Sequence, residues 1–253
     1  MKTNRMKSKL LAGEAALGCS IMVPSPQMVE MVGHAGFDWV LIDMEHGTID
    51  LETAELMIMA AEASGITPIV RPKTKHKEDI SRVMDRGAMG VQVPHVNSAE
   101  DARQAVSAVK FGPGDSRGLA AGTRPDSYGL SSSMAEFIKH SNEQTLVCVQ
   151  LEHVAAIENV DEILSVEGVD VFFIGPSDLS QSMGHPGNPK AEPVKNAIER
   201  TLLTITSAGK IPGMPASVNN LDAILSSGVR YIYTHLPKLV GAAASEFLKK
   251  GRA

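Results

Sequence analysis

The sequence predicts an α/β protein with a closed barrel of eight parallel strands that alternate with helices, a (β/α)8 or TIM barrel. Eight apolar runs of strand length recur along the chain, and helix-like segments separate most of them. The length of 253 residues fits one such barrel, with no linker or shift in composition, so residues 1–253 are expected to form a single domain. A doubly wound open sheet is the competing fold, but it rarely needs eight evenly spaced strands.

The expected strands are short and consist mostly of aliphatic residues, as buried strands of a parallel sheet do. They are Gly18–Val23, Trp39–Met44, Pro68–Arg71, Gly90–Pro94, Leu146–Glu152, Val171–Gly175, Ile211–Pro215 and Val229–Thr234.

Helix signals occupy the segments between these strands. Asp50 can cap a helix over Leu51–Ala63 that Gly65 ends, and Ser98 can cap a helix over Ala99–Val109. Two further helices are expected over Val160–Val166 and Val194–Ser207.

One connection, residues 111–144, is long and rich in Gly, Pro and Ser. A loop of this length in a compact domain is usually functional or disordered. It carries Arg117 and Arg124, which could meet an anionic substrate. A surface position on a flexible loop is an equal alternative for Arg124.

Composition and charge exclude several classes of function. The net charge is −5 and the Lys and Arg residues form no stripe, which argues against binding to nucleic acid. Apolar runs are too short for a membrane span, and the N-terminal apolar segment is too short for a signal peptide. The two cysteines, Cys19 and Cys148, lie in apolar runs and are expected to be reduced. We therefore expect a cytoplasmic protein.

The active site of a (β/α)8 barrel lies at the carboxyl ends of the strands. Glu152 and Asp178 follow consecutive apolar strands, so their carboxylates should lie side by side. Two carboxylates without His or Cys at matching spacing suit hard ions such as Mg²⁺ or Mn²⁺, and they leave positions for water and a chelating 2-oxo acid. Salt bridges at the barrel mouth, or a helix-capping role for Asp178, are the alternatives.

A cation and a base are found at neighbouring strand ends. Arg71 ends an apolar strand and could donate to a keto oxygen, although a salt bridge to Glu45 is also possible. His46 could act as a base whose imidazole Asp43 orients. His95 and His235 also end strands but have no carboxylate beside them in sequence, so they are weaker candidates.

Two further features of the strand ends suit an anionic substrate. Gln150 and Glu152 are two residues apart and share one face of their strand. At the turn after the next strand, the backbone amides of Ser177 and Asp178 could hold a substrate carboxylate.

Several motifs together resemble the HpcH/HpaI class II pyruvate aldolases over about residues 15–240. They are Ile42-Asp43-Met44-Glu45-His46-Gly47, Val70-Arg71-Pro72, Arg82 with Asp85-Arg86-Gly87-Ala88, Gln150-Leu151-Glu152, and Val166-Glu167-Gly168-Val169-Asp170 followed by Phe173-Ile174-Gly175-Pro176-Ser177-Asp178-Leu179-Ser180.

The resemblance implies a barrel that swaps its C-terminal helix with a neighbour, in a homo-oligomer such as a trimer or a hexamer built from trimers. It also implies a divalent metal (Mg²⁺, Mn²⁺ or Co²⁺) on Glu152 and Asp178. His46 would be the base together with Asp43, Arg71 would hold the pyruvate oxygen, and Gln150 would line the pocket. Asp85 would act near the site across a subunit boundary.

The predicted function is a metal-dependent aldol lyase whose partners are a small 2-oxo acid and an aldehyde. It would cleave a 4-hydroxy-2-oxo acid, such as a 2-keto-3-deoxy sugar acid or 2,4-dihydroxyhept-2-ene-1,7-dioate, to pyruvate and an aldehyde. One alternative is a Schiff-base aldolase that uses Lys73. Others are a citramalyl- or malyl-CoA-type lyase, an enolate decarboxylase, or a non-catalytic protein that binds 2-oxo acids.

Overall fold

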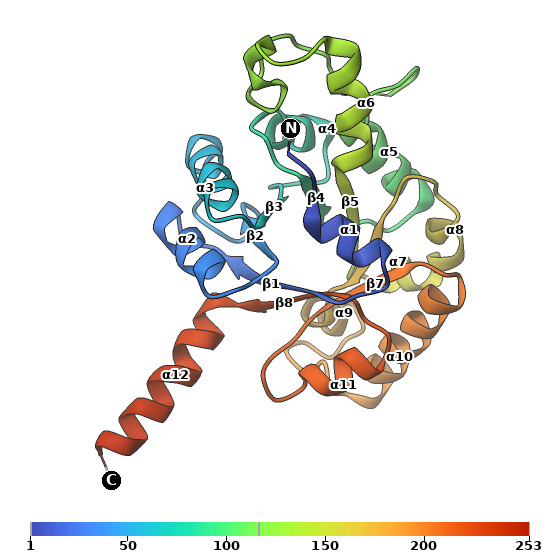
Figure 1. The fold of residues 1–253 in the computed structure, drawn as a ribbon. Helices are drawn as coiled ribbons and strands as arrows, with labels where there is room; N and C mark the ends of the chain where they lie inside the picture. The colour runs from blue at the N-terminus through green and yellow to red at the C-terminus, as the bar shows by residue number, and fades with distance from the viewer. Residues whose placement is uncertain (1, 116, 253) are drawn as a thin grey trace.

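The computed structural model describes residues 2–115 and 117–252. Eight parallel strands close into a barrel in chain order, as the sequence predicts (Figure 1). The strands are β1 (Ala16–Ile21), β2 (Trp39–Asp43), β3 (Thr67–Arg71), β4 (Gly90–Val93), β5 (Leu146–Leu151), β6 (Val171–Ile174), β7 (Ile211–Pro215) and β8 (Tyr231–His235). The largest shifts from the predicted bounds are about two residues, in β1 and β8.

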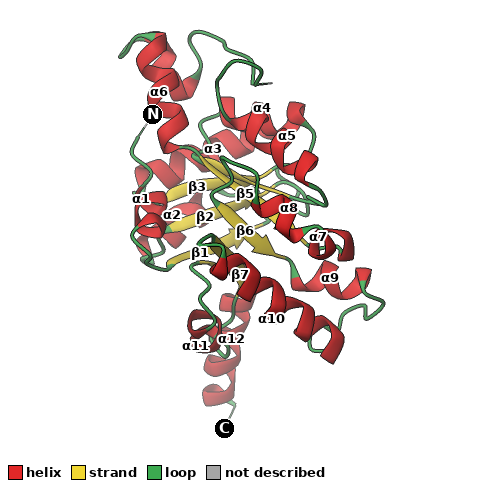
Figure 2. Ribbon diagram, turned by 90° about the vertical axis from the view of Figure 1, so that its right-hand side faces the viewer, coloured by secondary structure: helices red, strands yellow, loops and turns green. Residues whose placement is uncertain are grey.

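Helices enclose the strands (Figure 2). They are α1 (Arg5–Leu11), α2 (Pro26–His34), α3 (Leu51–Ala63), α4 (Lys77–Asp85), α5 (Ala99–Val109), α6 (Met134–Gln144), α7 (Val154–Glu158), α8 (Val160–Leu164), α9 (Pro176–Ser182), α10 (Glu192–Ser207), α11 (Leu221–Ser226) and α12 (Leu236–Gly251), with a 3-10 helix η1 (Arg124–Gly129). The predicted bounds and caps of α3 and α5 are confirmed. Asp50 Oδ1 accepts from the Thr53 amide at 2.7 Å, and Ser98 Oγ accepts from the Asp101 amide at 3.1 Å.

Side chains alternate along each strand between the barrel interior and the surrounding helices. On β2, Trp39 and Leu41 belong to the inner cluster, whereas Val40 and Ile42 pack in the outer layer. Asp43 continues the inward series and therefore emerges at the carboxyl end of the barrel. The same alternation brings Arg71 of β3 and Gln150 of β5 to the mouth.

Helix α1, for which the sequence carries no predicted helix signal, closes the opposite end of the barrel. Its residues Met6 and Leu10 are buried and join the inner cluster. The buried Asn4 caps the helix, because Asn4 Oδ1 accepts from the Lys7 amide at 2.9 Å. Asn4 Nδ2 also donates to the carbonyls of Met89 and Gln144, at 3.1 and 2.9 Å. The floor of the barrel is thereby closed, and the mouth is the open end.

The long connection contains η1 and α6 and holds its two arginines in ion pairs. Arg117 is buried, with Nη2 3.4 Å from Asp85 Oδ1 and its guanidinium 4.0 Å from the centre of the Phe111 ring. Arg124 Nη2 lies 2.5 Å from Glu62 Oε2. The expectation that these arginines meet the substrate is therefore not supported, because both are engaged in structural contacts.

Helix α12 projects away from the barrel, and none of its residues is buried (Figure 1). The implied exchange of this helix between subunits stays a prediction. Among the described residues, no helix combines the length and the apolar character that a membrane crossing requires.

Candidate active site

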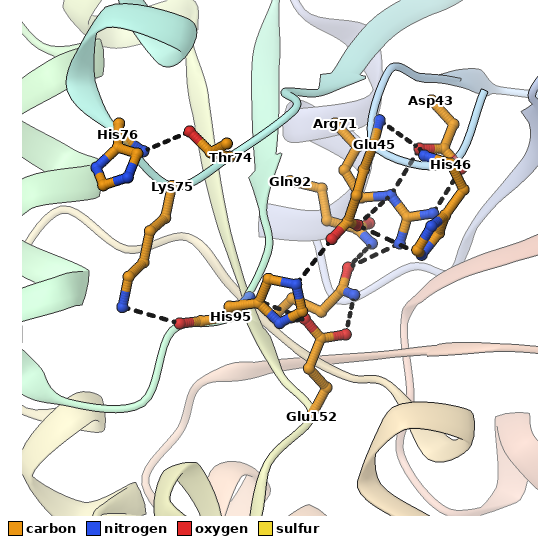
Figure 3. A network of polar contacts seen from close by, with 11 residues as sticks. Asp43, Glu45, His46, Arg71, Thr74, Lys75, His76, Gln92, His95 and Glu152 are labelled. Carbon is orange, nitrogen blue, oxygen red and sulfur yellow. Dashed lines mark hydrogen bonds and ion pairs between the residues drawn. The ribbon is translucent and has the colours of Figure 1, made fainter. Parts of the chain in front are cut away.

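The centre of the barrel mouth is a buried ion pair between neighbouring strands (Figure 3). Asp43 and Arg71 are aligned in the parallel register of β2 and β3. Arg71 donates through Nε to Asp43 Oδ1 at 2.9 Å and through Nη2 to Asp43 Oδ2 at 2.5 Å. Two parallel contacts of this kind fix the plane of a guanidinium as well as its position.

Burial and neighbouring charge shift the pKa of the Arg71 guanidinium in opposite directions. Burial is the largest influence and lowers the pKa of the guanidinium, but the hydrogen bonds and charge of Asp43 raise it by more. The pKa is therefore above its ordinary value. The side chain is a permanent cation at the mouth, and its Nη1 reaches Gln150 Oε1 at 3.4 Å.

Asp43 also fixes the loop that follows β2. Its Oδ1 accepts from the backbone amides of Glu45 at 3.1 Å and His46 at 3.2 Å. Among the described residues, the His46 side chain is instead paired with Glu45, Nε2 to Oε2 at 3.7 Å, and it is 54% exposed. The expectation that Asp43 orients the His46 imidazole is therefore corrected: Asp43 orients Arg71 and the backbone of His46.

A chain of amide side chains links this ion pair to Glu152. Tyr231 Oη donates to Gln92 Oε1 at 3.2 Å, and Gln92 Nε2 donates to Gln150 Oε1 at 2.5 Å. Gln150 Nε2 in turn donates to Glu152 Oε2. Gln150 and Glu152 do share one face of their strand, and Gln150 also reaches Arg71, which the sequence did not predict. The role of Gln150 in lining a substrate pocket stays a prediction.

Glu152 is a buried carboxylate with a 2% exposed side chain. Burial raises its pKa, while hydrogen bonds from Gln150 and from the His95 amide act in the other direction. The His95 amide donates to Glu152 Oε1 at 2.8 Å. A buried carboxylate of this kind requires a proton or a cation for compensation.

His95 joins two acidic residues that come from different strand ends. Its Nδ1 lies 3.0 Å from Glu152 Oε1, and its Nε2 lies 3.0 Å from Glu45 Oε1 (Figure 3). Ligand atoms of Glu45, His95 and Glu152 all lie within 4.8 Å of one another. His95 was a weak candidate because no carboxylate is adjacent in sequence. The barrel supplies both carboxylates from other strand ends.

Asp178 and Ser177 lie in the first turn of α9, which begins directly after Gly175. Strands β5 and β6 are paired, with Leu151 opposite Ile174, so Glu152 and Gly175 come next to each other. A Cβ atom on Gly175 would lie 2.9 Å from Glu152 Oε2, so only glycine leaves this space free. Asp178 is half-buried and lies outside the cluster of Glu45, His95 and Glu152.

The wall formed by β8 and β1 carries two polar atoms without hydrogen bonds. Ser20 and His235 are aligned in the register of these strands. Both Ser20 Oγ and His235 Nδ1 are buried, and neither has a partner among the described residues. Burial, followed by the charges of Lys238 and Arg71, lowers the pKa of His235. Burial at this position therefore disfavours the charged form of the imidazole.

Two other sequence candidates lie apart from this network. Asp85 ends α4 and pairs with Arg117. Lys73 is exposed and borders a small cavity of about 70 Å³ together with Asp79 and Arg82. A Schiff-base lysine needs an environment that favours its neutral amine. Lys73 lies on the exterior rather than in a desolvated apolar pocket.

A parallel eight-stranded barrel with buried charged side chains at the carboxyl ends of its strands is the architecture of a (β/α)8-barrel enzyme. The sequence matches the HpcH/HpaI aldolase/citrate lyase family over residues 18–233. The chain belongs to this family of carbon–carbon lyases, as its motifs predict.

Named relatives and a solved structure agree with this assignment. The chain is 38% identical over 214 residues to a hydroxypyruvate/pyruvate aldolase of Pseudomonas aeruginosa, covering 85% of this chain and 79% of that protein. It is 34% identical over 215 residues to a 5-keto-4-deoxy-D-glucarate aldolase of Shigella boydii, covering 85% and 82%. A crystal structure of an HpcH/HpaI aldolase/citrate lyase family protein from Burkholderia cenocepacia superposes with a TM-score of 0.93 at 28% identity, covering 99% and 100%.

Proposed function

We propose that this protein is a divalent-metal-dependent aldolase that cleaves a 4-hydroxy-2-oxo acid to pyruvate and an aldehyde, and that also catalyses the reverse addition. The observation that carries the proposal is the permanent cation of Arg71, fixed by Asp43 and linked through Gln150 to the buried carboxylate of Glu152. The names of the two aldolase relatives, which include pyruvate and a keto-deoxy sugar acid, support the substrate class.

Glu152 and Asp178 are the residues proposed to hold the ion, which would be Mg²⁺, Mn²⁺ or Co²⁺. Their chemistry fits: Glu152 is buried, and among the described residues no Lys or Arg pairs with it and no hydrogen bond is made by the Asp178 carboxylate. When bound, such an ion acts as a Lewis acid toward the oxygens of a 2-oxo acid.

Arg71 is proposed to donate a hydrogen bond to the keto oxygen, where negative charge develops during the reaction. Because Asp43 already fixes the guanidinium, little reorganisation is needed as that charge appears. Removing one preorganised donor of this kind typically raises the barrier by about 2.7–4 kcal/mol. Arg71→Ala should therefore reduce turnover severely.

His46 is proposed to move the proton at the 4-hydroxyl in cleavage and at the methyl group of pyruvate in the reverse direction. Its imidazole is partly exposed on a loop whose backbone Asp43 holds in place. The backbone amides of Ser177 and Asp178 remain candidates for holding the substrate carboxylate, and Asp85 remains a candidate that acts from a neighbouring subunit.

The proposal is tested by measuring pyruvate release from 4-hydroxy-2-oxo acids of different lengths, after EDTA treatment and after addition of Mg²⁺, Mn²⁺ or Co²⁺. We expect no turnover in EDTA, restoration by metal, and loss of turnover in Glu152→Ala and Asp178→Ala. His46→Ala should abolish exchange of the methyl protons of pyruvate. His153→Ala is the matched control, since His153 follows Glu152 but its Nδ1 accepts from the Ala155 amide at 3.2 Å.

Activity that persists in EDTA and is trapped by borohydride in the presence of pyruvate would contradict the proposal and favour a Schiff-base lysine. Metal-dependent binding of pyruvate without turnover on any hydroxy-oxo acid would instead indicate a binding protein.

A further inference from the structure

We propose that His95 is a third protein ligand of the metal ion, through Nδ1 and next to Glu152, and that Glu45 orients the His95 ring. This inference rests on the proposed function only in assuming that Glu152 holds a divalent ion. It adds a nitrogen donor to a site that the sequence alone describes with carboxylates.

The two contacts of the His95 ring are not compatible with a neutral imidazole alone. Nε2 and Nδ1 each lie 3.0 Å from a carboxylate oxygen, of Glu45 and Glu152 respectively. A neutral imidazole has one N–H, so if Nε2 donates to Glu45, Nδ1 presents a lone pair to Glu152 Oε1. Two acceptors at this distance repel each other unless a proton or a metal cation lies between them.

The spacing of the two facing atoms suits two ligands of one ion. Adjacent ligands about 2.1 Å from an octahedral ion are separated by about 3.0 Å. The distance from His95 Nδ1 to Glu152 Oε1 is 3.0 Å. Both side chains can therefore bind one ion with only small movements.

The backbone of His95 is held in a conformation that directs the ring to this position. Its φ angle is 55°, in the left-handed region that costs a non-glycine residue roughly 1–2 kcal/mol. The His95 amide is bound by Glu152 at 2.8 Å, and the His95 carbonyl accepts from Lys75 Nζ at 3.3 Å. Lys75 is in turn held by Asp101 at 2.7 Å. Contacts on both sides of the residue thus maintain the strained backbone.

Glu45 completes the arrangement as the partner of the other ring nitrogen. Its side chain is only 9% exposed. Glu45 Oε1 faces His95, while Oε2 has no hydrogen bond within the described part of the chain and lies 3.2 Å from Arg71 Nε. Metal-binding histidines usually donate their second ring N–H to a carboxylate, which fixes the tautomer and makes the ligand more basic. Glu45 is placed to serve that purpose.

A nitrogen ligand has a consequence for ion choice. Carboxylate and water ligands suit Mg²⁺, whereas imidazole favours the later first-row ions. The protein should therefore bind Co²⁺ more tightly than Mg²⁺, and His95 should account for a large part of the difference.

The test is titration calorimetry of Mn²⁺, Co²⁺ and Mg²⁺ into the metal-free full chain, with pulsed EPR of the Mn²⁺ complex. We expect hyperfine coupling from a directly bound imidazole nitrogen in the wild type. His95→Gln should lose this coupling, weaken Co²⁺ binding at least about tenfold and weaken Mg²⁺ binding less. Glu45→Gln should weaken Co²⁺ binding by roughly 10- to 100-fold. His76→Gln, at an exposed histidine whose side chain makes no capping bond to α4, should change nothing.

Failure of this inference and failure of the proposed function give different results. If wild-type Mn²⁺ lacks nitrogen coupling, His95 is not a ligand, whether or not the variants fold. If His95→Gln keeps the wild-type order of ion affinities while Glu152→Ala abolishes binding, the His95 assignment is wrong and the metal-dependent aldolase stands. If Glu152→Ala binds all three ions with unchanged affinity, the proposed metal site itself is wrong.

Discussion

Asp43 determines the geometry of the mouth although its carboxylate is covered by other protein groups. It accepts two hydrogen bonds from Arg71 and two from the backbone of the next loop. Removing one charge from a buried ion pair typically costs about 3–5 kcal/mol, because the partner charge remains buried. We therefore expect Asp43 to act by positioning other groups, with consequences for stability as well as for activity.

Asp43→Asn should therefore lose several kcal/mol of stability together with most of the turnover. The substituted amide keeps the size of the side chain but presents an NH₂ group to the guanidinium. Urea unfolding and pyruvate-release kinetics measure the two effects. Glu100→Gln is the control, since it removes an exposed ion pair with Arg103 that should contribute nothing measurable. An Asp43→Asn enzyme with normal stability and turnover would contradict this role.

Gly175 tests how closely the proposed metal site around Glu152 is packed. Its φ angle of −95° is open to any residue, so the effect of a substitution is steric. Gly175→Ala would place a methyl group 2.9 Å from Glu152 Oε2 and should displace that carboxylate. We expect weaker Mn²⁺ binding by calorimetry with a folded barrel. Gly118→Ala, where a Cβ meets no atom within 4 Å, should bind Mn²⁺ as the wild type does. Equal affinities in the two variants would show that Glu152 can move freely.

Sequence reasoning located single site residues better than it located their partners. Arg71, Gln150 and Glu152 were predicted because each ends or follows an apolar strand, and all three meet in the barrel mouth. The partners of His95 and Asp43 were missed. Strand order brings chain segments together, but which atoms meet depends on side-chain conformations and on the loop after β2, and neither is encoded in a short motif.

Among the elements, those with a complete local signal were predicted most accurately. Helices α3 and α5 have a capping residue and enough length, and their bounds agree with the structure. Helix α1 has only seven residues, and an isolated helix of that length is unstable. It exists because Met6 and Leu10 pack into the barrel floor, which is a tertiary effect.

Asn4 should be the main polar contributor to this floor. Besides capping α1, it bonds to Met89 and to Gln144, and loss of these buried partners typically costs about 1–3 kcal/mol. Asn4→Ala should lower the free energy of unfolding by an amount in that range and leave the kinetics nearly unchanged, since the site lies at the other end. Ser133→Ala removes the exposed cap of α6 and should have a smaller effect on unfolding. Equal losses in the two variants would contradict a special role for the floor.

At the scale of the whole molecule, α12 packs against its own barrel only near its start, where Leu236 and Leu239 touch the core, and none of its residues is buried. The helix exposes Val240 and Phe247, the latter at 77%. At its base, an apolar cavity of about 200 Å³ lies over β1 and β8, lined by residues that include Leu17, Phe37 and Val218. An apolar helix face and an apolar cavity on the same chain are complementary. We therefore expect α12 of a second copy to cover this side of the barrel.

Phe247→Glu should separate the assembly into smaller species in analytical ultracentrifugation, because a buried charge at a subunit contact is costly. Ser245→Glu, which adds the same charge on the other side of the helix, should leave the assembly intact. If Asp85 acts across a subunit boundary, dissociation should also lower turnover. It should not weaken Mn²⁺ binding at Glu152, since the proposed metal ligands all belong to one chain. A wild-type monomer with full turnover would contradict both the exchange of α12 and the shared role of Asp85.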